Sequence, residues 1–539
     1  MHSGPPAGRE AARREWHMGT WLDNGVFYEI YPQSFNDTNN DGIGDIPGII
    51  EKLDYIQELG CNALWLNPCF VSPFGDAGYD VADYCQVAPR YGTNDDLIRL
   101  CEACHERGMH VLLDLVPGHT SIEHPWFKES CKAAPNECTG RYVWNDNVWA
   151  PMEVKGISGV LRGISERNGA VGVNFFSFQP ALNYGFAEIT EPWQSAVDSP
   201  EALATRQAMK DVMAFWLERG VDGFRVDMAG SLVKNDPGQE ATIALWQDMR
   251  AFLDEKYPEA VLISEWGEPD KTILAGFHMD FLLQFGTSHY MDLFRRPEHS
   301  TAEPHPFFSR EGKGDASEFV ATYKRNLELT NGRGLMCIPS GNHDMERMRR
   351  YLDPDEMKMA FAFIMSMPGC PFVYYGDEIG MRHLDVTSVE GGYMRTGARS
   401  PMQWDDSVNH GFSGAAADDL YIPEDPAADA PTVAAEMADE HSLWHEVQKL
   451  IALRQATPAL GVTAGIEFVY CEKDAYPLVY LRTAGDERVL VALNPAGRPV
   501  EIPCAFEAKS VLYTLGDAPE LAGGTLRMPP ASAAFFAVK

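Results

Sequence analysis

Two acidic side chains, Asp227 and Glu265, stand at the ends of two apolar, strand-like runs and could act together on one bond. Asp227 closes the run GFRVD, in which Arg225 lies two positions earlier and therefore on the same strand face. A carboxylate beside a guanidinium is favoured in its charged form, which suits Asp227 to nucleophilic attack. Reduced solvation beside Trp266 would raise the pKa of Glu265 and suit that carboxyl to proton donation.

An Arg–Asp pair on a strand is more often a structural ion pair, so the interpretation depends on what other strand ends carry. Asp344 and His343 follow another strand-like run, and His119 follows a third, in the motif DLVPGH. Asp344 is suited to bind sugar hydroxyls, and the two histidines to donate hydrogen bonds to them. A metal site is the less favoured reading, because the histidines lack short metal-ligand spacing.

Neighbouring strands would bring Asp227 and Glu265 together, at the separation of about 5–5.5 Å that retaining glycosidases use. Asp227 would attack the anomeric carbon and form a covalent glycosyl-enzyme. Glu265 would protonate the leaving oxygen and then activate water. The sequence therefore predicts glycoside cleavage with retention of configuration.

Strand-like and helix-like runs alternate over most of the chain, which predicts an α/β protein with a (β/α)8 barrel. The predicted barrel strands are Val26–Tyr31, Ala63–Asn67, His110–Val116, Phe224–Asp227, Ala260–Glu265, Met279–Phe285, Leu335–Asn342 and Pro371–Gly376. The predicted divisions are a disordered leader (1–19), the barrel (20–118 and 201–458), an inserted domain after the third strand (119–200) and a C-terminal antiparallel β-sandwich (459–539). The insertion is too long and irregular for an ordinary barrel loop.

A net charge of −34 argues against a nucleic-acid or anionic-membrane partner, since either would need a basic face. The chain has no apolar run of membrane-spanning length. Eleven cysteines in no disulfide-like pattern favour a reducing compartment, and Cys101 and Cys104 fall on the apolar stripe of a helix as buried thiols. We expect a soluble cytoplasmic protein whose oligomeric state the sequence leaves open.

The motifs GFRVD, SEW, NHD and DLVPGH occur in the order found in the α-amylase family, glycoside hydrolase family 13, which this sequence resembles over nearly its whole length. The resemblance implies that Asp227 is the nucleophile, Glu265 the acid/base and Asp344 the transition-state stabiliser. It implies that Arg225, His119 and His343 contribute to substrate binding. The chain departs from the family at Gly118, where Asn is usual, and we expect no metal there.

The segment Asp37–Asp45 resembles the calcium loop of oligo-1,6-glucosidase-like members. Oxygen ligands at alternate positions could hold one structural Ca²⁺. The implied ligands are Asp37, Asn39, Asp41, Asp45 and the carbonyl of Ile43.

The motifs GYD and RSPMQW resemble the substrate clamp of the same subgroup. Tyr79 would offer an aromatic face to the sugar, and Asp80 with Arg399 would bind the far hydroxyl of the terminal glucose and close the site beyond one residue. Alternatively, Asp80 and Arg399 pair only to hold loops. Two departures, Ala181 for a usual Asp and Met228 after the nucleophile, fall where linkage preference is set, so the linkage remains open.

The resulting hypothesis is an exo-acting, retaining α-glucosidase acting on short oligosaccharides or disaccharides. One alternative is a transglycosidase on the same scaffold, of trehalose-synthase-like or sucrose-isomerase-like type. A catalytically silent binding or transporter-partner protein is disfavoured, because all three acids and Arg225 are present.

Overall fold

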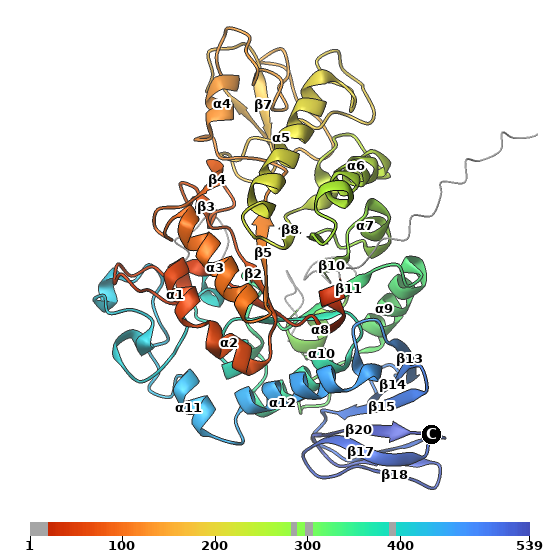
Figure 1. Cartoon of the computed structure of the whole chain (residues 1–539). Coiled ribbons are helices and arrows are strands. Elements are labelled where there is room, and N and C mark those ends of the chain that lie inside the picture. The colour runs from red at the N-terminus through yellow and green to blue at the C-terminus, as the bar shows by residue number, and fades with distance from the viewer. Residues whose placement is uncertain (1–19, 282–287, 297–304, 388–394) are drawn as a thin grey trace, which may run out of the picture.

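Eight parallel strands close into a barrel in the order β1-β2-β5-β8-β9-β10-β11-β12, as expected (Figure 1). The computed structural model describes residues 20–281, 288–296, 305–387 and 395–539. The barrel strands are β1 (Phe27–Ile30), β2 (Ala63–Leu66), β5 (His110–Leu115), β8 (Gly223–Val226), β9 (Val261–Ser264), β10 (Met279–Phe281), β11 (Leu335–Pro339) and β12 (Cys370–Tyr374). The predicted leader 1–19 and the end of the predicted strand Met279–Phe285 lie outside the described residues.

The helices that surround the barrel begin where the sequence provides N-terminal caps. Thr93 and Asp96 form a capping box at α3, and Asp353 and Glu356 form one at α10. Ser199 caps α5, whose first residue is a proline. Outside the insertion, the helices are α1 (Ile46–Glu51), α2 (Leu53–Leu59), α3 (Asn94–Glu106), α5 (Pro200–Leu217), α6 (Glu240–Lys256), α7 (Pro269–Ala275), α8 (Met291–Phe294), α9 (Ser317–Thr330), α10 (Pro354–Ser366), α11 (Val433–Ala438) and α12 (Leu443–Ala456).

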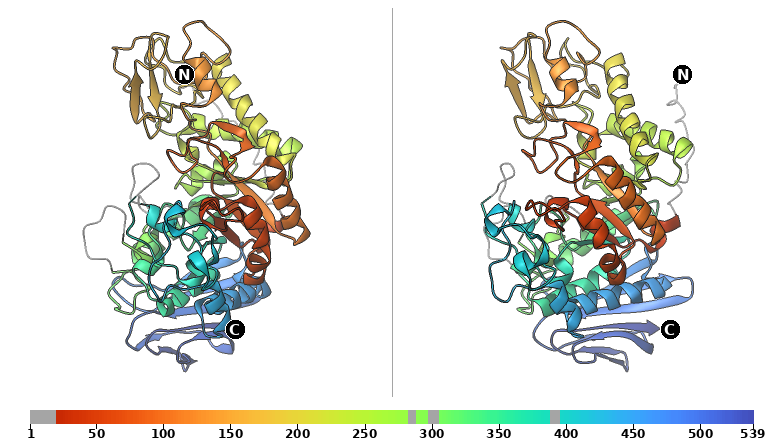
Figure 2. Two further views of the ribbon diagram at one scale, coloured as in Figure 1. Left: turned by 90° about the vertical axis from the view of Figure 1, so that its left-hand side faces the viewer. Right: turned by 60° about the vertical axis from the view of Figure 1, so that its left-hand side comes forward.

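The segment between β5 and α5 forms an excursion with little regular structure. It contains α4 (Pro125–Ser130) and an antiparallel pair, β6 (Gly159–Arg162) and β7 (Ala170–Val173). A second short pair, β3 (Phe70–Val71) and β4 (Asp83–Val87), lies between β2 and α3. Figure 2 shows the excursion at one end of the molecule and the C-terminal sheets at the other.

The C-terminal region consists of two antiparallel sheets that enclose a separate apolar cluster. The five-stranded sheet contains β13 (Gly465–Tyr470), β14 (Leu478–Ala484), β15 (Glu487–Asn494), β20 (Ser532–Val538) and β17 (Ala508–Leu515). The three-stranded sheet contains β16 (Val500–Pro503), β19 (Thr525–Met528) and β18 (Glu520–Ala522). The sequence predicted the strands of the larger sheet but missed the smaller one, whose strands are only three or four residues long.

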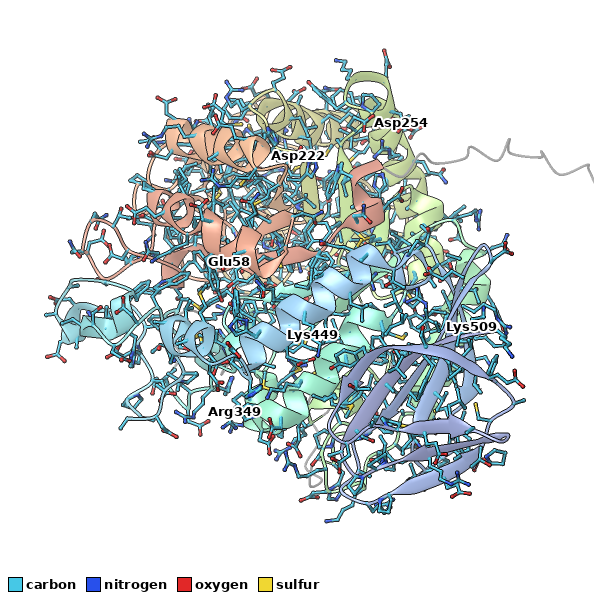
Figure 3. The ribbon with its side chains drawn as sticks, turned by 60° about the horizontal axis from the view of Figure 1, so that its bottom comes forward. Glu58, Asp222, Asp254, Arg349, Lys449 and Lys509 are labelled. Carbon is cyan, nitrogen blue, oxygen red and sulfur yellow. The ribbon has the colours of Figure 1, made fainter. Side chains whose placement is uncertain are left out.

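Helix α12 joins the barrel to the C-terminal sheets. Figure 3 shows this helix, marked by Lys449, passing between the two parts. The Lys449 ammonium lies 4.7 Å from the ring centre of Tyr513 on β17, and Arg454 donates to the carbonyls of Met365 and Met367 after α10. Through these contacts α12 packs against both the C-terminal sheet and the barrel helix α10.

Gly223 opens the strand that leads to Asp227, and its lack of a side chain permits the pairing of β8 with β9. A Cβ atom at this position would lie 2.1 Å from the carbonyl oxygen of Val261. The register of β8 on β9 depends on this close approach, because Gly223 pairs with Val261.

We expect Gly223→Ala to destabilise the protein by about 3 kcal/mol, because the new methyl group meets backbone that cannot rotate away. The measurement is the melting temperature of the variant. Gly485→Ala is the matched control, since that glycine has φ +56° but nothing within 4 Å of its Cβ position. The control should lose only about 1 kcal/mol. Equal losses for both variants would contradict the steric argument.

Candidate active site

The Arg225 guanidinium lies at the centre of the site and contacts three carboxylates. Its Nη1 lies 2.9 Å from Asp114 and 3.3 Å from Asp227, and its Nη2 lies 2.7 Å from Glu265. Arg225 is only 3% exposed, so these charged hydrogen bonds act with little solvent screening. The expectation that Arg225 and Asp227 project together is met, and the same cation also holds the second acid.

Asp227 and Glu265 form an interacting pair rather than two independent acids. Their side chains lie within hydrogen-bonding reach of each other. Burial and the neighbouring Glu265 carboxyl raise the pKa of Asp227 well above its ordinary value, against the opposing effect of Arg225. Arg225 lowers the pKa of Asp227, as the sequence analysis expected, but burial and Glu265 act in the opposite direction. Arg225 is shared among three buried carboxyls, so its charge does not act on Asp227 alone.

The segments that follow β8 and β9 position Asp227 and Glu265. Met228 adopts a left-handed backbone (φ 42°), and its N–H donates to Glu265 Oε2 at 3.2 Å. Asp280 on β10 accepts from the Ser264 hydroxyl at 2.7 Å and the Trp266 N–H at 3.1 Å, which holds the segment on both sides of Glu265. Burial raises the pKa of Asp280 to about 7.

Asp344 lies in a different electrostatic environment, between two arginines. Arg395 Nη1 is 2.7 Å and Arg399 Nη2 is 2.9 Å from its Oδ1. Burial would raise the pKa of Asp344, but Arg395, His343 and Arg399 together hold it well below its ordinary value. The pKa of Asp344 is therefore lowered, whereas that of Asp227 is raised.

Asp80 and Arg399 do not pair with each other, so the alternative of an ion pair that only holds loops is not supported. Asp80 is buried and accepts hydrogen bonds from the Ser72 hydroxyl and the backbone N–H groups of Gly75 and Asp76. Asp80 therefore shapes its own loop, while Arg399 donates to Asp344 and to the His343 carbonyl.

Asp76 and Arg395 are the residues that the sequence reasoning missed. Arg395 bridges Asp76 and Asp344, and Gln179 from the excursion donates to Asp76 at 2.8 Å. Asp76 lies four residues before Asp80, and Arg395 lies four residues before Arg399. The sequence analysis named only the later acid and the later arginine. Only the tertiary contacts distinguish the alternatives.

Tyr79 and His343 are packed together beneath the acids. The Tyr79 hydroxyl donates to Asp114 at 3.0 Å and lies 2.7 Å from His343 Nε2. Because that hydroxyl gives its hydrogen to Asp114, His343 is the donor in the second bond. The two rings stack at 5.4 Å, so His343 covers one face of the ring that was expected to meet a sugar.

His119 is buried and neutral, and its hydrogen-bonding role differs from the expected one. Its Nε2 lies 3.1 Å from the Tyr79 carbonyl, which can only accept, so this nitrogen carries the single N–H. Nδ1 is then an acceptor. A sugar hydroxyl would donate to His119 here, whereas the sequence analysis expected His119 to be the donor.

The comparisons with known proteins agree with this geometry. The family model described as "Alpha amylase, catalytic domain" matches residues 29–462. The chain belongs to the α-amylase family of glycoside hydrolases. It is therefore a glycoside hydrolase, as the sequence motifs predicted.

Relatives with different activities match at similar levels. Oligo-1,6-glucosidase of Parageobacillus thermoglucosidasius is 31% identical over 88% of this chain and 90% of its own. Trehalose synthase/amylase TreS of Mycobacterium tuberculosis (strain CDC 1551 / Oshkosh) is 32% identical over 90% of this chain and 84% of its own. The structure of trehalulose synthase MutB from Pseudomonas mesoacidophila MX-45 shares the fold, with TM-score 0.81, 24% identity and coverage of 96% and 99%.

Two departures from the usual α-amylase-family residues have local structural explanations. At Gly118, a Cβ would lie 2.8 Å from the amide nitrogen of Asn174, which donates to the Gly118 carbonyl and accepts from Lys234. The excursion therefore fills the space that a side chain at position 118 would need. Ala181 is fully buried in an apolar cluster with Val143, where a charged Asp would be costly.

The loop that resembles a calcium site is held by its own side chains. Asp37 accepts from the N–H groups of Asn39 and Gly42, and Asp45 caps α1 through Gly48. Both carboxylates are buried, and the charge of Asp37 contributes to the raised pKa of Asp45, for which burial is the main cause. Two neighbouring buried carboxylates of like charge would fit a bound cation, which would add to the hydrogen bonds that they already accept.

The neutral state of His119 predicts a loss of stability in acid. Burial lowers its pKa to about 4 from an ordinary 6.5, so the unfolded chain binds this proton first as pH falls. The stabilising contribution is complete above pH 6.5 and is lost toward pH 4, at most about 3 kcal/mol. We expect the melting temperature of His119→Gln to fall less between pH 7 and pH 5 than that of the wild type.

The exposed His441 offers the control, and His441→Gln should reproduce the wild-type pH dependence. An unchanged slope for His119→Gln would show that this histidine does not contribute.

Proposed function

We propose that the protein is a retaining, exo-acting α-glucosidase that hydrolyses terminal α-linked glucose from short α-glucosides. The observation that carries the proposal is the Arg225 guanidinium, which holds Asp227 and Glu265 side by side at the ends of β8 and β9. Retaining glycosidases need two carboxyls in such proximity. In the α-amylase family the glucosidase and oligo-1,6-glucosidase relatives support this activity.

In the proposed reaction, Asp227 attacks the anomeric carbon as Glu265 protonates the departing oxygen. The proton of the acid pair must therefore lie on Glu265 when substrate is bound. The two carboxyls lie within hydrogen-bonding reach, so a proton can pass from Asp227 to Glu265. Glu265 then removes a proton from water, which attacks the glucosyl-Asp227 ester and releases glucose.

Exo action is proposed from the ion-pair bridge beside Asp344. Arg395 joins Asp344 to Asp76, and Gln179 holds Asp76 from the excursion. This bridge would bind the far hydroxyls of one glucose and block a longer chain from continuing past it. Asp344 would bind the hydroxyls of the same ring, and His119 would accept from one of them.

Transglycosylation is the alternative, and the trehalose synthase/amylase relative at 32% identity favours it. Both outcomes share the covalent intermediate, and they differ only in whether water or a sugar reaches it. Product identity therefore decides between them.

The experiment is product analysis on maltose, isomaltose, sucrose and trehalose, with free glucose measured separately. We expect free glucose from at least one substrate and a loss in kcat on the order of 10⁴ or more for Asp227→Asn. Asp211→Asn on the exposed face of α5 is the control and should retain full activity. Isomerised disaccharide without free glucose would reject the hydrolase, and equal turnover by Asp227→Asn would reject the site.

We also propose one structural Ca²⁺ held by Asp37, Asn39, Asp41, Asp45 and the Ile43 carbonyl. The ion would compensate the buried carboxylates of the loop and take no part in catalysis. The Ser413 hydroxyl donates to Asp37 Oδ2 at 2.6 Å, so this loop also holds the segment before α11.

Removing Ca²⁺ with a chelator should lower the melting temperature by about 5 °C, and added Ca²⁺ but not Mg²⁺ should restore it. Asp41→Asn should abolish the response, because Asp41 is exposed and its loss removes a ligand charge without disturbing the core. A chelator-insensitive melting temperature would count against the ion.

A reducing, cytoplasmic location fits this proposal. The structure contains eleven free cysteines, and Cys101 and Cys104 are buried as expected. Among the described residues, no helix is both long and apolar enough to cross a membrane.

A further inference from the structure

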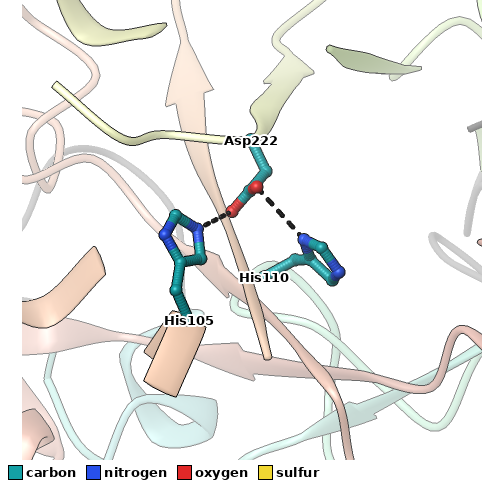
Figure 4. Close-up of side chains that lie close together, drawn as sticks. All are labelled: His105, His110 and Asp222. Carbon is teal, nitrogen blue, oxygen red and sulfur yellow. Dashed lines mark hydrogen bonds and ion pairs between the residues drawn. The ribbon is translucent and has the colours of Figure 1, made fainter. Parts of the chain in front are cut away.

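A cluster of two histidines and one aspartate lies at the opposite end of the barrel from Asp227 and Glu265. His110 is the first residue of β5, Asp222 immediately precedes β8, and His105 lies in the last turn of α3 (Figure 4). The acids Asp227 and Glu265 follow the other ends of their strands, so the cluster is separate from the candidate active site. Figure 3 locates Asp222 on the barrel in a second orientation.

The cluster is compact, and the Asp222 carboxylate stands between the two rings. His105 Nε2 lies 2.9 Å from Oδ2 of Asp222, and His110 Nδ1 lies 3.1 Å from Oδ1. One ligand atom from each residue falls within 4.8 Å of the other two. In the part of the chain that the structure describes, no other three His, Cys, Asp or Glu side chains were found with ligand atoms this close.

Neighbouring groups hold two of the three side chains in place. The Val111 N–H donates to Asp222 Oδ2 at 2.8 Å. Trp21 stacks on the His110 ring at 4.1 Å with an interplanar angle of 16°. Such support from outside the ligand set is the usual way in which proteins orient metal ligands.

The cluster is also accessible. The side chains of His105, His110 and Asp222 are 41%, 25% and 19% exposed, so an ion could enter and retain water as a further ligand.

We propose that His105, His110 and Asp222 form a binding site for a borderline divalent cation of the Zn²⁺ type. Two imidazoles and one carboxylate are a donor set that Zn²⁺ accepts, with metal–ligand distances near 2.0–2.2 Å. Ligand atoms around a tetrahedral ion at those distances lie about 3.3 Å apart. The nitrogen–oxygen separations of 2.9 and 3.1 Å would widen by a few tenths of an ångström, and the two ring nitrogens lie within 4.8 Å of each other.

The ion needs from each histidine a ring nitrogen that carries no hydrogen. His105 would bind through Nε2 and His110 through Nδ1, each keeping its remaining proton on the other ring nitrogen. Asp222 would contribute one oxygen or both. A neutral ring meets this need by carrying its single hydrogen on the other nitrogen, whereas a protonated ring must first release a proton, so binding is weakened in acid.

The expected role is structural, because the site joins three elements of the barrel wall. It would cross-link the end of α3 to the starts of β5 and β8, the two adjacent strands that carry Asp114 and Arg225. The proposal does not depend on the reaction that the active site performs. An inactive protein with an intact cluster should still bind the ion.

The test is titration of the metal-free full-length chain with Zn²⁺ and Co²⁺, in excess Ca²⁺ to saturate any site for that ion. Isothermal calorimetry should show one Zn²⁺ site, which is absent in His105→Gln. Co²⁺ should produce a visible absorption band that Zn²⁺ displaces. Zn²⁺ should also raise the melting temperature of the wild type but not of the variant.

His289→Gln is the matched control, because His289 also contacts two carboxylates, those of Asp292 and Glu318, outside the cluster. It should bind Zn²⁺ as the wild type does. The proposal is rejected if wild type and His105→Gln bind Zn²⁺ equally, or if no binding is detected. In either case the three residues serve only as hydrogen-bonded ion pairs between the strands.

Discussion

The site depends on one buried cation that is shared among three carboxyls. Arg225 reaches Asp114, Asp227 and Glu265 from a position that is 3% exposed. Without it, three acids would be buried close together, and their mutual repulsion would favour protonation of all three. With it, the site retains negative charge, although burial still raises the pKa of Asp114 to about 6. Arg225 therefore sets both the positions of the acids and the number of protons they hold.

Asp344 is paired with cations other than Arg225, so the acids of the site lie in two different electrostatic environments. Asp344 is held by Arg395 and Arg399, which lower its pKa, while burial and the neighbouring Glu265 carboxyl raise the pKa of Asp227. Proton donation needs the second kind of environment, and binding of a developing positive charge needs the first. The excursion after β5 joins the same network, because Gln179 holds Asp76, which Arg395 connects to Asp344.

The two ends of the barrel present different chemistry. The ends of β8, β9 and β11 carry acids and arginines, as expected for the catalytic end of this fold. The starts of β5 and β8 carry the histidine–aspartate cluster, whose partners are strand and helix termini. The same pair of strands thus links a site for chemistry to a site for cross-linking. A gain of rigidity at one end would be transmitted along β5 and β8 without any change in the reacting groups.

The sequence by itself determined the barrel, all eight of its strands and the three acids, because apolar runs and the polar residues that end them are local patterns. It did not determine which carboxylate meets which guanidinium. Asp76 lies four residues before Asp80, and Arg395 four residues before Arg399, and only long-range packing places Arg395 between Asp76 and Asp344. Nor could the sequence show the coupling of Asp227 to Glu265, since a pKa depends on burial and on neighbours from other strands. The sequence missed the smaller C-terminal sheet for a related reason, because strands of three or four residues give too short a local pattern and gain their order from pairing.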